Sequence, residues 1–256
     1  MTVKPPAGLL EGKVAIITGA SRGIGEAAAE YFAQAGAAVV LAARRMEALA
    51  AVAERIEKDG GTAFPVEVDV TDEASVARLV SRTVEHFGRL DVALNNAGMN
   101  PSAPMPIDVY PMEELRQIVD VKVMGTAYAL KHEIAAMKAT GGGAIVNQTS
   151  VVAFRGTDGL FPAASASQAA IVGLTKAAAA ACAPFGIRVN ALAIGAVDTG
   201  WLHELSEEER AARAARIPLG RLGVGADVAA QAAWLCSDHC AWTSGAVVPI
   251  DGGALA

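Results

Sequence analysis

Short apolar runs alternate with helix-length segments along the whole chain. The runs lie at 13–17, 37–42, 62–68, 91–94, 144–148, 187–192 and 245–249. Apolar strands separated by helices predict a parallel sheet that is covered by helices on both faces. We therefore expect an α/β protein built on a parallel sheet of about seven strands.

A proline inside the third run tests the order of these strands. Pro65 would interrupt a central ladder because it lacks an N–H donor, whereas an edge strand tolerates it. The doubly wound order 3-2-1-4-5-6 places the third strand at an edge. The chain has 256 residues and no internal repeat or linker, which suits one domain. We predict a single-domain, doubly wound, Rossmann-like sheet over residues 1–256.

The least regular segments follow the fourth, fifth and sixth predicted strands. They span residues 99–111, 151–163 and 197–216. Ligands of doubly wound sheets bind beyond the carboxyl ends of the strands, so we expect these three loops to contact the substrate. The last loop runs from Trp201, Leu202 and His203 into a charged helical pattern, which fits either a mobile lid or a solvated surface helix.

A glycine-rich turn separates the first strand from the first helical pattern. Its sequence, Thr18-Gly19-Ala20-Ser21-Arg22-Gly23-Ile24-Gly25, has the spacing G-x-x-x-G-x-G. Glycines allow positive φ and close backbone approach, and the helix that follows offers free N–H groups and its positive end to a phosphate. We expect a nucleotide pyrophosphate here, bound by Gly19, Ser21, Arg22, Gly23, Ile24 and Gly25.

The end of the second strand bears on the choice of nucleotide. Sites selective for NAD usually have an acidic residue here for the ribose 2′-hydroxyl, but this strand ends in Ala43. Arg44 and Arg22 would instead offer cations to a 2′-phosphate, which predicts NADP; two solvated arginines are the alternative. Asp69 and Val70 are expected beside the adenine, although Asp69 could instead cap the helix that begins shortly after it.

Composition and charge narrow the class of partners. The formal charge of −6 argues against nucleic acid or an anionic membrane as the main partner. The apolar stretch 169–187 contains Lys176 and Pro184, which predicts a buried helix and no membrane span.

Three cysteines without C-x-x-C spacing, and no leader-like start, favour a cytoplasmic protein. The four histidines lack ligand spacing, so no metal site is expected.

Three more motifs fall at predicted strand ends. They are Asn95-Asn96-Ala97-Gly98 after the fourth strand, Ser150 after the fifth, and Asp251-Gly252-Gly253 after the last. With the glycine turn, they make the chain closely resemble the short-chain dehydrogenase/reductase family over essentially its full length. The resemblance implies an oxidoreductase that uses a nicotinamide cofactor, acts on a small-molecule substrate and forms a homodimer or homotetramer.

The resemblance also carries over to single positions. It implies cofactor contacts from Asn96, Ala97, Gly98, Val197 and Thr199, the last two near the nicotinamide carboxamide. The active site of the family is a set of Asn, Ser, Tyr and Lys. Here Ala164 and Gln168 stand at the Tyr and Lys positions of the Y-x-x-x-K motif, and Lys122 stands at the asparagine of the V-N-x-x-G motif. Only Ser150 matches.

These changes remove the usual proton donor, because alanine has no proton to give to a carbonyl oxygen. Lys122 is the best replacement, since a partly desolvated ammonium has a lowered pKa. The alternatives are that Lys122 reaches solvent or pairs with Asp120 or Glu133. Gln168 is expected to hydrogen-bond the cofactor ribose without bringing a charge. Weaker candidate donors lie in the substrate loops: Tyr110, Asp158 and His203.

Three functions follow as hypotheses. The first is an NADP-dependent oxidoreductase that acts on a carbonyl, imine or alcohol with an atypical proton donor. The second is a non-catalytic NADP-binding subunit that pairs with an active relative in a hetero-oligomer. The third is a non-redox dehydratase or cyclase in which Ser150 and Lys122 polarise a carbonyl.

Overall fold

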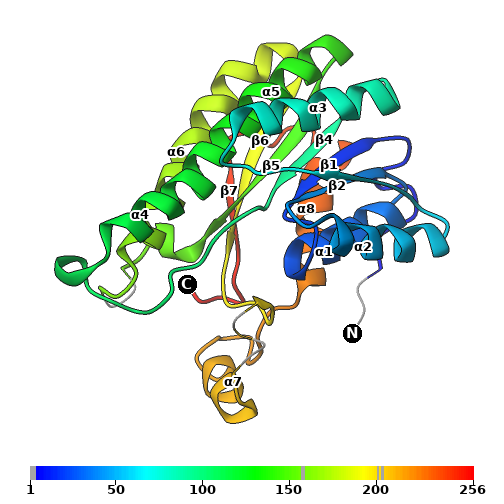
Figure 1. The fold of residues 1–256 in the computed structure, drawn as a ribbon. Helices are drawn as coiled ribbons and strands as arrows, with labels where there is room; N and C mark the ends of the chain where they lie inside the picture. The colour runs from blue at the N-terminus through cyan, green and yellow to red at the C-terminus, as the bar shows by residue number, and fades with distance from the viewer. Residues whose placement is uncertain (1–3, 157–158, 201, 203–204) are drawn as a thin grey trace.

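The sheet has seven parallel strands, as the apolar runs predict (Figure 1). The computed structural model describes residues 4–156, 159–200, 202 and 205–256. The strands are β1 (Val14–Thr18), β2 (Ala38–Ala43), β3 (Thr62–Glu67), β4 (Val92–Asn95), β5 (Gly143–Ser150), β6 (Ile187–Ile194) and β7 (Val247–Ile250). Their order is β3-β2-β1-β4-β5-β6-β7, so the doubly wound prediction is confirmed and Pro65 lies in an edge strand.

The described part of the chain has eight α-helices. They are α1 (Gly23–Gln34), α2 (Met46–Lys58), α3 (Glu73–Phe87), α4 (Met112–Val119), α5 (Gly125–Thr140), α6 (Pro162–Cys182), α7 (Glu207–Ala214) and α8 (Gly225–Cys236). Helices α1, α2 and α8 cover one face, and α3, α5 and α6 cover the other (Figure 1). Helix α7 projects away from the sheet and has no buried residue.

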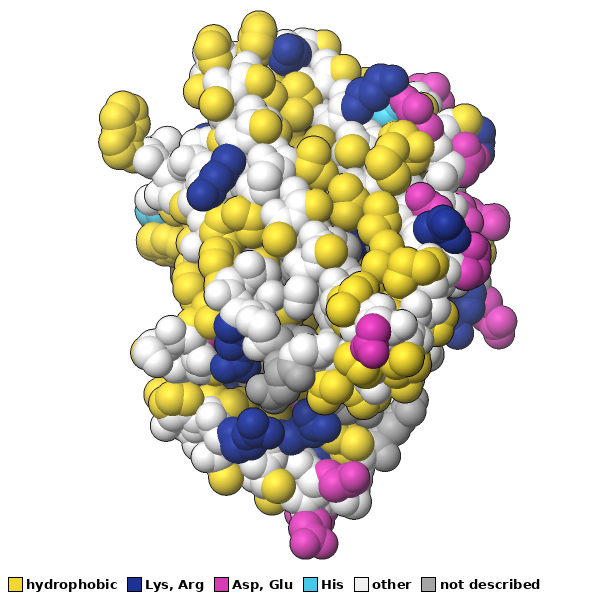
Figure 2. Space-filling view, turned by 90° about the vertical axis from the view of Figure 1, so that its left-hand side faces the viewer, with side chains coloured by type: hydrophobic (Ala, Val, Ile, Leu, Met, Phe, Trp, Pro, Cys, Tyr) yellow, Lys and Arg dark blue, Asp and Glu magenta, His cyan; other side chains and the backbone are white. Residues whose placement is uncertain are grey.

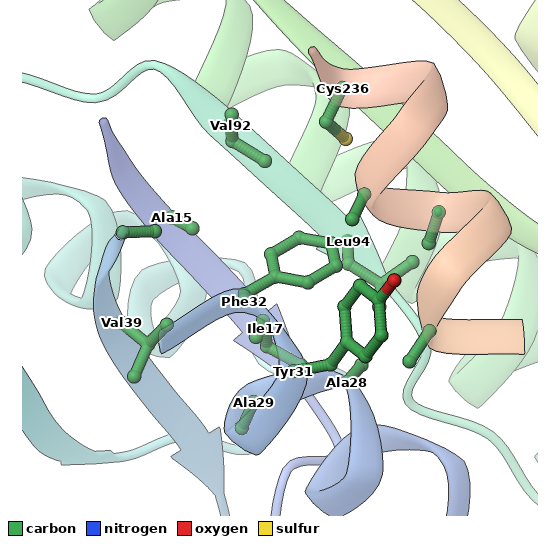
Figure 3. Packing of buried hydrophobic residues seen from close by; sticks show 14 of the residues in the cluster. Ala15, Ile17, Ala28, Ala29, Tyr31, Phe32, Val39, Val92, Leu94 and Cys236 are labelled. Atoms are coloured by element: carbon green, nitrogen blue, oxygen red, sulfur yellow. The ribbon is translucent and has the colours of Figure 1, made fainter. Parts of the chain in front are cut away.

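The alternation of side chains along β1 explains why both faces need covering. Ala15 and Ile17 point into the cluster that packs against α1 and α8, while Val14 and Ile16 belong to the cluster beneath α3, α5 and α6. Figure 3 shows the first cluster, where Phe32 of α1 lies fully buried close to Leu94 of β4. Strand β1 is therefore buried on both sides, which accounts for its continuous apolar run.

The apolar stretch near residue 180 is less buried than predicted. Residues Pro162–Phe185 are long and apolar enough to cross a membrane by length and composition alone. Helix α6 buries one side on the sheet, through residues such as Ile171 and Thr175, but Ala169 and Lys176 are exposed. The expectation of a buried helix was therefore wrong for the outer side of α6. Alanine and glycine make the sequence apolar there, but these residues are exposed.

Candidate active site

The glycine turn packs so closely against neighbouring atoms that it leaves no room for side chains at Gly19 and Gly25. Gly19 and Gly23 have φ of +70° and +63°, a region that disfavours side chains. A Cβ on Gly25 would overlap the Gly19 carbonyl oxygen, and one on Gly19 would lie 2.8 Å from Asn96 Nδ2. Helix α1 begins directly after Arg22, so its free N–H groups open onto this turn. The arrangement can hold a pyrophosphate, as the spacing predicts.

The turn after β4 is bound to the glycine turn through one threonine. Thr18 Oγ1 accepts hydrogen bonds of 3.0 Å from the backbone N–H groups of both Asn96 and Ala97. Asn96 Nδ2 donates in return to the Thr18 carbonyl oxygen at 2.9 Å. The predicted cofactor residues of these two turns therefore form one unit. Thr18 was part of the quoted motif but was not singled out; a hydroxyl at the last residue of β1 was the available signal.

The predicted adenosine contacts lie on the neighbouring strand ends. Arg22 and Arg44 are both exposed, while Ser21 and Ile24 are half-buried. Asp69 accepts hydrogen bonds from the N–H and hydroxyl of Thr71, and these bonds, with the charge of Arg44, lower the pKa of its carboxyl. Asp69 does not cap α3, because Asp72 does so by accepting from Ala74 N.

Three further predicted cofactor contacts come from other elements. Val70 lies against Gly125 at the start of α5, where an added Cβ would approach Val70 to 3.2 Å. Thr199 lies against the glycine turn, 3.4 Å from the position that a Gly23 Cβ would take, while Val197 is buried and paired with Gly223. The structure thus brings the loop after β6 next to the first turn of α1.

Lys122 occupies an irregular turn between α4 and α5. Residues Asp120–Met124 form one π-helical turn, and the Lys122 side chain there is buried, with the residue only 7% exposed. It makes no hydrogen bond or ion pair with a described residue, so neither alternative predicted for it, solvent or a pair with Asp120 or Glu133, is found. Burial lowers the pKa of Lys122 to about 8.

The Lys122 ammonium points toward the turn after β4. A Cβ on Gly98 would lie only 2.7 Å from Lys122 Nζ, so the absence of a side chain at Gly98 makes room for the lysine. One extra residue in the helix, which a π turn provides, rotates the positions that follow it and is common at functional sites. Lys122 therefore lies against Gly98, in the turn after β4 that holds the predicted cofactor residues.

The other predicted catalytic positions lie at the end of β5 and in the first turns of α6. The Ser150 hydroxyl donates to the Ile194 carbonyl oxygen at 3.1 Å and accepts from Val152 N at 3.4 Å. Ala164 is half-buried, and Gln168 is 6% exposed. Gln168 Oε1 is buried and has no hydrogen-bond partner in the described part of the chain. An unpaired buried acceptor is expected to receive a donor from a ligand or a water.

Of the three weaker candidate proton donors, Tyr110 lies in the described part of the chain. Tyr110 is buried in a small cluster with Ile118 and Ala163. Burial, together with the neighbouring Glu114 carboxylate, raises the pKa of Tyr110 to about 12, which makes it a poor acid near neutrality. Asp158 and His203 lie outside the described residues. Among the described residues, no group of three or more His, Cys, Asp or Glu side chains is placed to hold a metal ion.

The fold and this site define a class: nucleotide-binding α/β proteins with the ligand edge at the carboxyl ends of a doubly wound sheet. Comparison with known proteins makes the class specific, since residues 19–254 match the family model described as enoyl-(acyl carrier protein) reductase. The chain belongs to the short-chain dehydrogenase/reductase family. Dehydrogenases and reductases of this family use nicotinamide cofactors.

Individual relatives match over nearly the whole chain. The chain is 41% identical over 246 residues to cis-4-hydroxycyclohexanecarboxylate dehydrogenase of Sinomonas cyclohexanicum, covering 95% of this chain and 97% of the relative. It is 37% identical to meso-2,3-butanediol dehydrogenase of Serratia marcescens, with 96% of each covered. A crystal structure of a short-chain type dehydrogenase/reductase from Mycobacterium marinum superposes with a TM-score of 0.87 at 34% identity, covering 96% of each chain.

Proposed function

We propose that the protein is an NADP-dependent oxidoreductase that interconverts a small ketone or aldehyde and its alcohol, with Lys122 as the proton donor. The observation that carries the proposal is the buried, unpaired Lys122 ammonium beside Gly98, in a family whose usual tyrosine and lysine positions are here Ala164 and Gln168. The names of the relatives support the reaction class, because they are dehydrogenases of a cyclohexane alcohol and a butanediol.

The residues present fit a dinucleotide carrier. Bulk is excluded at Gly19 and Gly25, where a Cβ would overlap backbone or Asn96 atoms, so a pyrophosphate can approach the main chain closely. Lys122 Nζ has a proton to donate and Gln168 Oε1 is an acceptor without a donor. We assign these two groups to the nicotinamide ribose, where Lys122 Nζ would donate to a hydroxyl oxygen and Gln168 Oε1 would accept from a hydroxyl group. When bound, the carrier supplies or accepts the hydride.

Side chains of the protein itself would supply the proton in this reaction. In reduction, the Ser150 hydroxyl turns from Ile194 to donate to the substrate oxygen, and the Lys122 ammonium gives that oxygen its proton as hydride reaches the carbon. The product is the alcohol and a neutral lysine, which takes a proton back from water. A pKa of about 8 suits this exchange, because both protonation states are then accessible near neutrality.

The same charge distinguishes among the substrates considered. A buried ammonium without a carboxylate partner repels a cationic iminium and attracts the negative charge that develops on a carbonyl oxygen. It therefore favours carbonyls over imines. Relatives named as dehydrogenases also favour hydride transfer over a non-catalytic subunit or a dehydratase.

The proposal is tested by assaying the purified protein for NADPH oxidation with a panel of small ketones, aldehydes and imines. We expect turnover with cyclic or short-chain ketones and little or none with iminium compounds. The reverse reaction should reduce NADP with the matching alcohols. No change in nicotinamide absorbance with any member of the panel, although NADPH binds, would contradict an oxidoreductase and favour the non-catalytic reading.

Selectivity for NADP over NAD is proposed to depend on Arg44, assisted by Arg22. We expect Arg44→Ala to raise the Kd for NADPH about 10- to 100-fold, the effect of losing a charge-assisted hydrogen bond, and to leave the Kd for NADH within about twofold. Arg45→Ala is the matched control, since Arg45 is an equally exposed neighbour. Calorimetric titration measures both constants. Equal losses for the two carriers would assign Arg44 to the pyrophosphate instead.

We also propose that the protein is a homodimer or homotetramer in the cytoplasm. Short-chain dehydrogenases/reductases are commonly oligomeric, and the outer side of α6 offers an apolar surface. Its exposed residues are mostly small: Ala166, Ala169, Gly173, Ala177 and Ala180. Figure 2 views the molecule from the side where α4 and α6 lie and shows hydrophobic side chains spread over it. Burial of this surface against a second copy would complete the covering of α6.

A further inference from the structure

A chain of buried polar groups lies beneath the turn after β4. Glu133 of α5 is 1% exposed, and its Oε2 accepts a hydrogen bond of 3.0 Å from Asn95 Nδ2. The same amide donates to Asn147 Oδ1 on β5, and Asn147 Nδ2 donates to Thr175 Oγ1 on α6, both at 3.0 Å. One carboxyl group thus ends a chain of hydrogen bonds that joins two helices to two central strands.

A small cavity adjoins this chain. Its volume is about 10 Å³, and its polar lining residues are Thr18, Asn95, Thr126 and Glu133. That is about the room that the centre of one water molecule needs, and the lining supplies the two to four polar partners such a water requires. Asn95 Oδ1 is buried and has no hydrogen-bond partner among the residues that the structure describes. A buried acceptor of this kind costs free energy unless a donor reaches it.

The cavity lies next to residues that adjoin the candidate active site. Ala97 and Val121 line it, and they are the neighbours in sequence of Gly98 and Lys122. Gly98 and Lys122 are in turn in contact, because Lys122 Nζ fills the space beside the Gly98 Cα. A displacement of the Asn95–Gly98 turn would therefore change the place of the Lys122 ammonium.

We propose that the cavity binds one ordered water, which donates to Asn95 Oδ1 and bonds to Glu133, and that Glu133 is thereby a positioning residue for the Asn95–Gly98 turn. Thr18 Oγ1 fixes Asn96 and Ala97 from the glycine turn, and Glu133 fixes Asn95 from α5. The Asn95–Gly98 turn is therefore fixed by hydrogen bonds from the glycine turn on one side and from α5 on the other. The effect on cofactor binding rests on the proposed function, whereas the water site does not.

The surroundings of Glu133 contain no compensating charge. In the cavity lining, all of which belongs to the described part of the chain, Glu133 is the one ionisable group. Helix α3 presents apolar Val76 and Leu79 to the cavity, β1 presents Thr18, and β4 presents Asn95. The neighbours of Glu133 in sequence, Lys131 and His132, face Glu73 of α3 instead. Position and hydrogen bonding, rather than an ion pair, therefore define the role of this carboxyl group.

The test compares Glu133→Leu, Glu133→Gln and Thr126→Val in the full-length protein. We expect Glu133→Leu to raise the Kd for NADPH about tenfold and Thr126→Val about threefold, the effects of one or two lost hydrogen bonds, while Glu133→Gln keeps an acceptor and stays within about twofold. Glu85→Gln on α3 is the control, because Glu85 is exposed. Circular dichroism establishes that each variant is folded, and a high-resolution crystal structure of the wild type should show density for the water.

Each outcome decides the inference. Unchanged affinity in folded Glu133→Leu and Thr126→Val, or a cavity without density, overturns it. If Glu133→Leu does not fold, Thr126→Val and the density decide. If the wild type binds no NADPH, the proposed function fails by itself, and the density alone then supports or removes the water site.

Discussion

Lys122→Met is expected to lower the rate of carbonyl reduction by about 10² to 10⁴, the usual effect of losing a positioned general acid. Methionine fills similar volume beside Gly98 and removes the proton that the substrate oxygen needs. The loss corresponds to roughly 3 to 5 kcal/mol of barrier. Single-turnover stopped-flow measurement with bound NADPH separates this loss from any change in binding. Below pH 8 the wild-type rate should be nearly constant, and it should fall as Lys122 loses its proton at higher pH.

Two comparisons separate the role of this lysine from its effect on folding. Lys131→Met is the matched control, because Lys131 lies in α5, directly after the turn that holds Lys122, is exposed and pairs with Glu73. The triple variant Lys122→Asn, Ala164→Tyr, Gln168→Lys restores the set of residues typical of the family and should recover much of the rate. A folded Lys122→Met variant that reduces ketones as fast as the wild type would remove Lys122 as the proton donor.

The fold could be predicted because its strands carry a strong signal. The strands buried on both faces appear as apolar runs, and Pro65 indicated that the third strand lies at an edge of the sheet. The run near β5 was predicted to end at residue 148, but pairing with β6 continues to Ser150 opposite Ile194. Polar residues at the carboxyl end of a strand break the apolar pattern without breaking the ladder, so sequence alone places such ends too early.

The tight backbone of the glycine turn could also be predicted from the sequence, whereas the surroundings of Lys122 could not. The spacing of the glycines reflects the backbone conformation of the turn, which depends on residues close together in the sequence. The burial of Lys122 depends on a π turn between α4 and α5 and on the missing side chain of Gly98, which is distant in sequence. Glu133 was predicted only as a possible partner of Lys122. Its actual contact, Asn95, could not be found from helical spacing because it lies on a strand.

Glu133→Gln is expected to make the protein more stable near neutral pH while leaving its stability near pH 4.5 almost unchanged. Burial raises the pKa of Glu133 from 4.5 to about 7, because the ionised carboxylate is poorly solvated between α5 and the sheet. The folded state therefore binds this proton more tightly than the unfolded state does. Between these two pH values the unfolded state releases it first, so wild-type stability falls as pH rises.

The size of this effect follows from the shift in pKa. A pKa raised from 4.5 to about 7 corresponds to roughly 3 kcal/mol of stability, which is lost progressively between these two pH values; the loss is complete above them. Glutamine keeps an oxygen for Asn95 Nδ2 and has no proton to lose. Urea unfolding at one protein concentration gives the difference in free energy between wild type and variant at each pH. Carboxyl groups with a lowered pKa, such as those of Asp69 and Asp227, change protonation below this pH range, and their effects cancel in the difference between wild type and variant.

A difference that does not change between pH 4.5 and 7 would mean that Glu133 titrates as a solvated carboxyl, and that water reaches it freely in the folded protein.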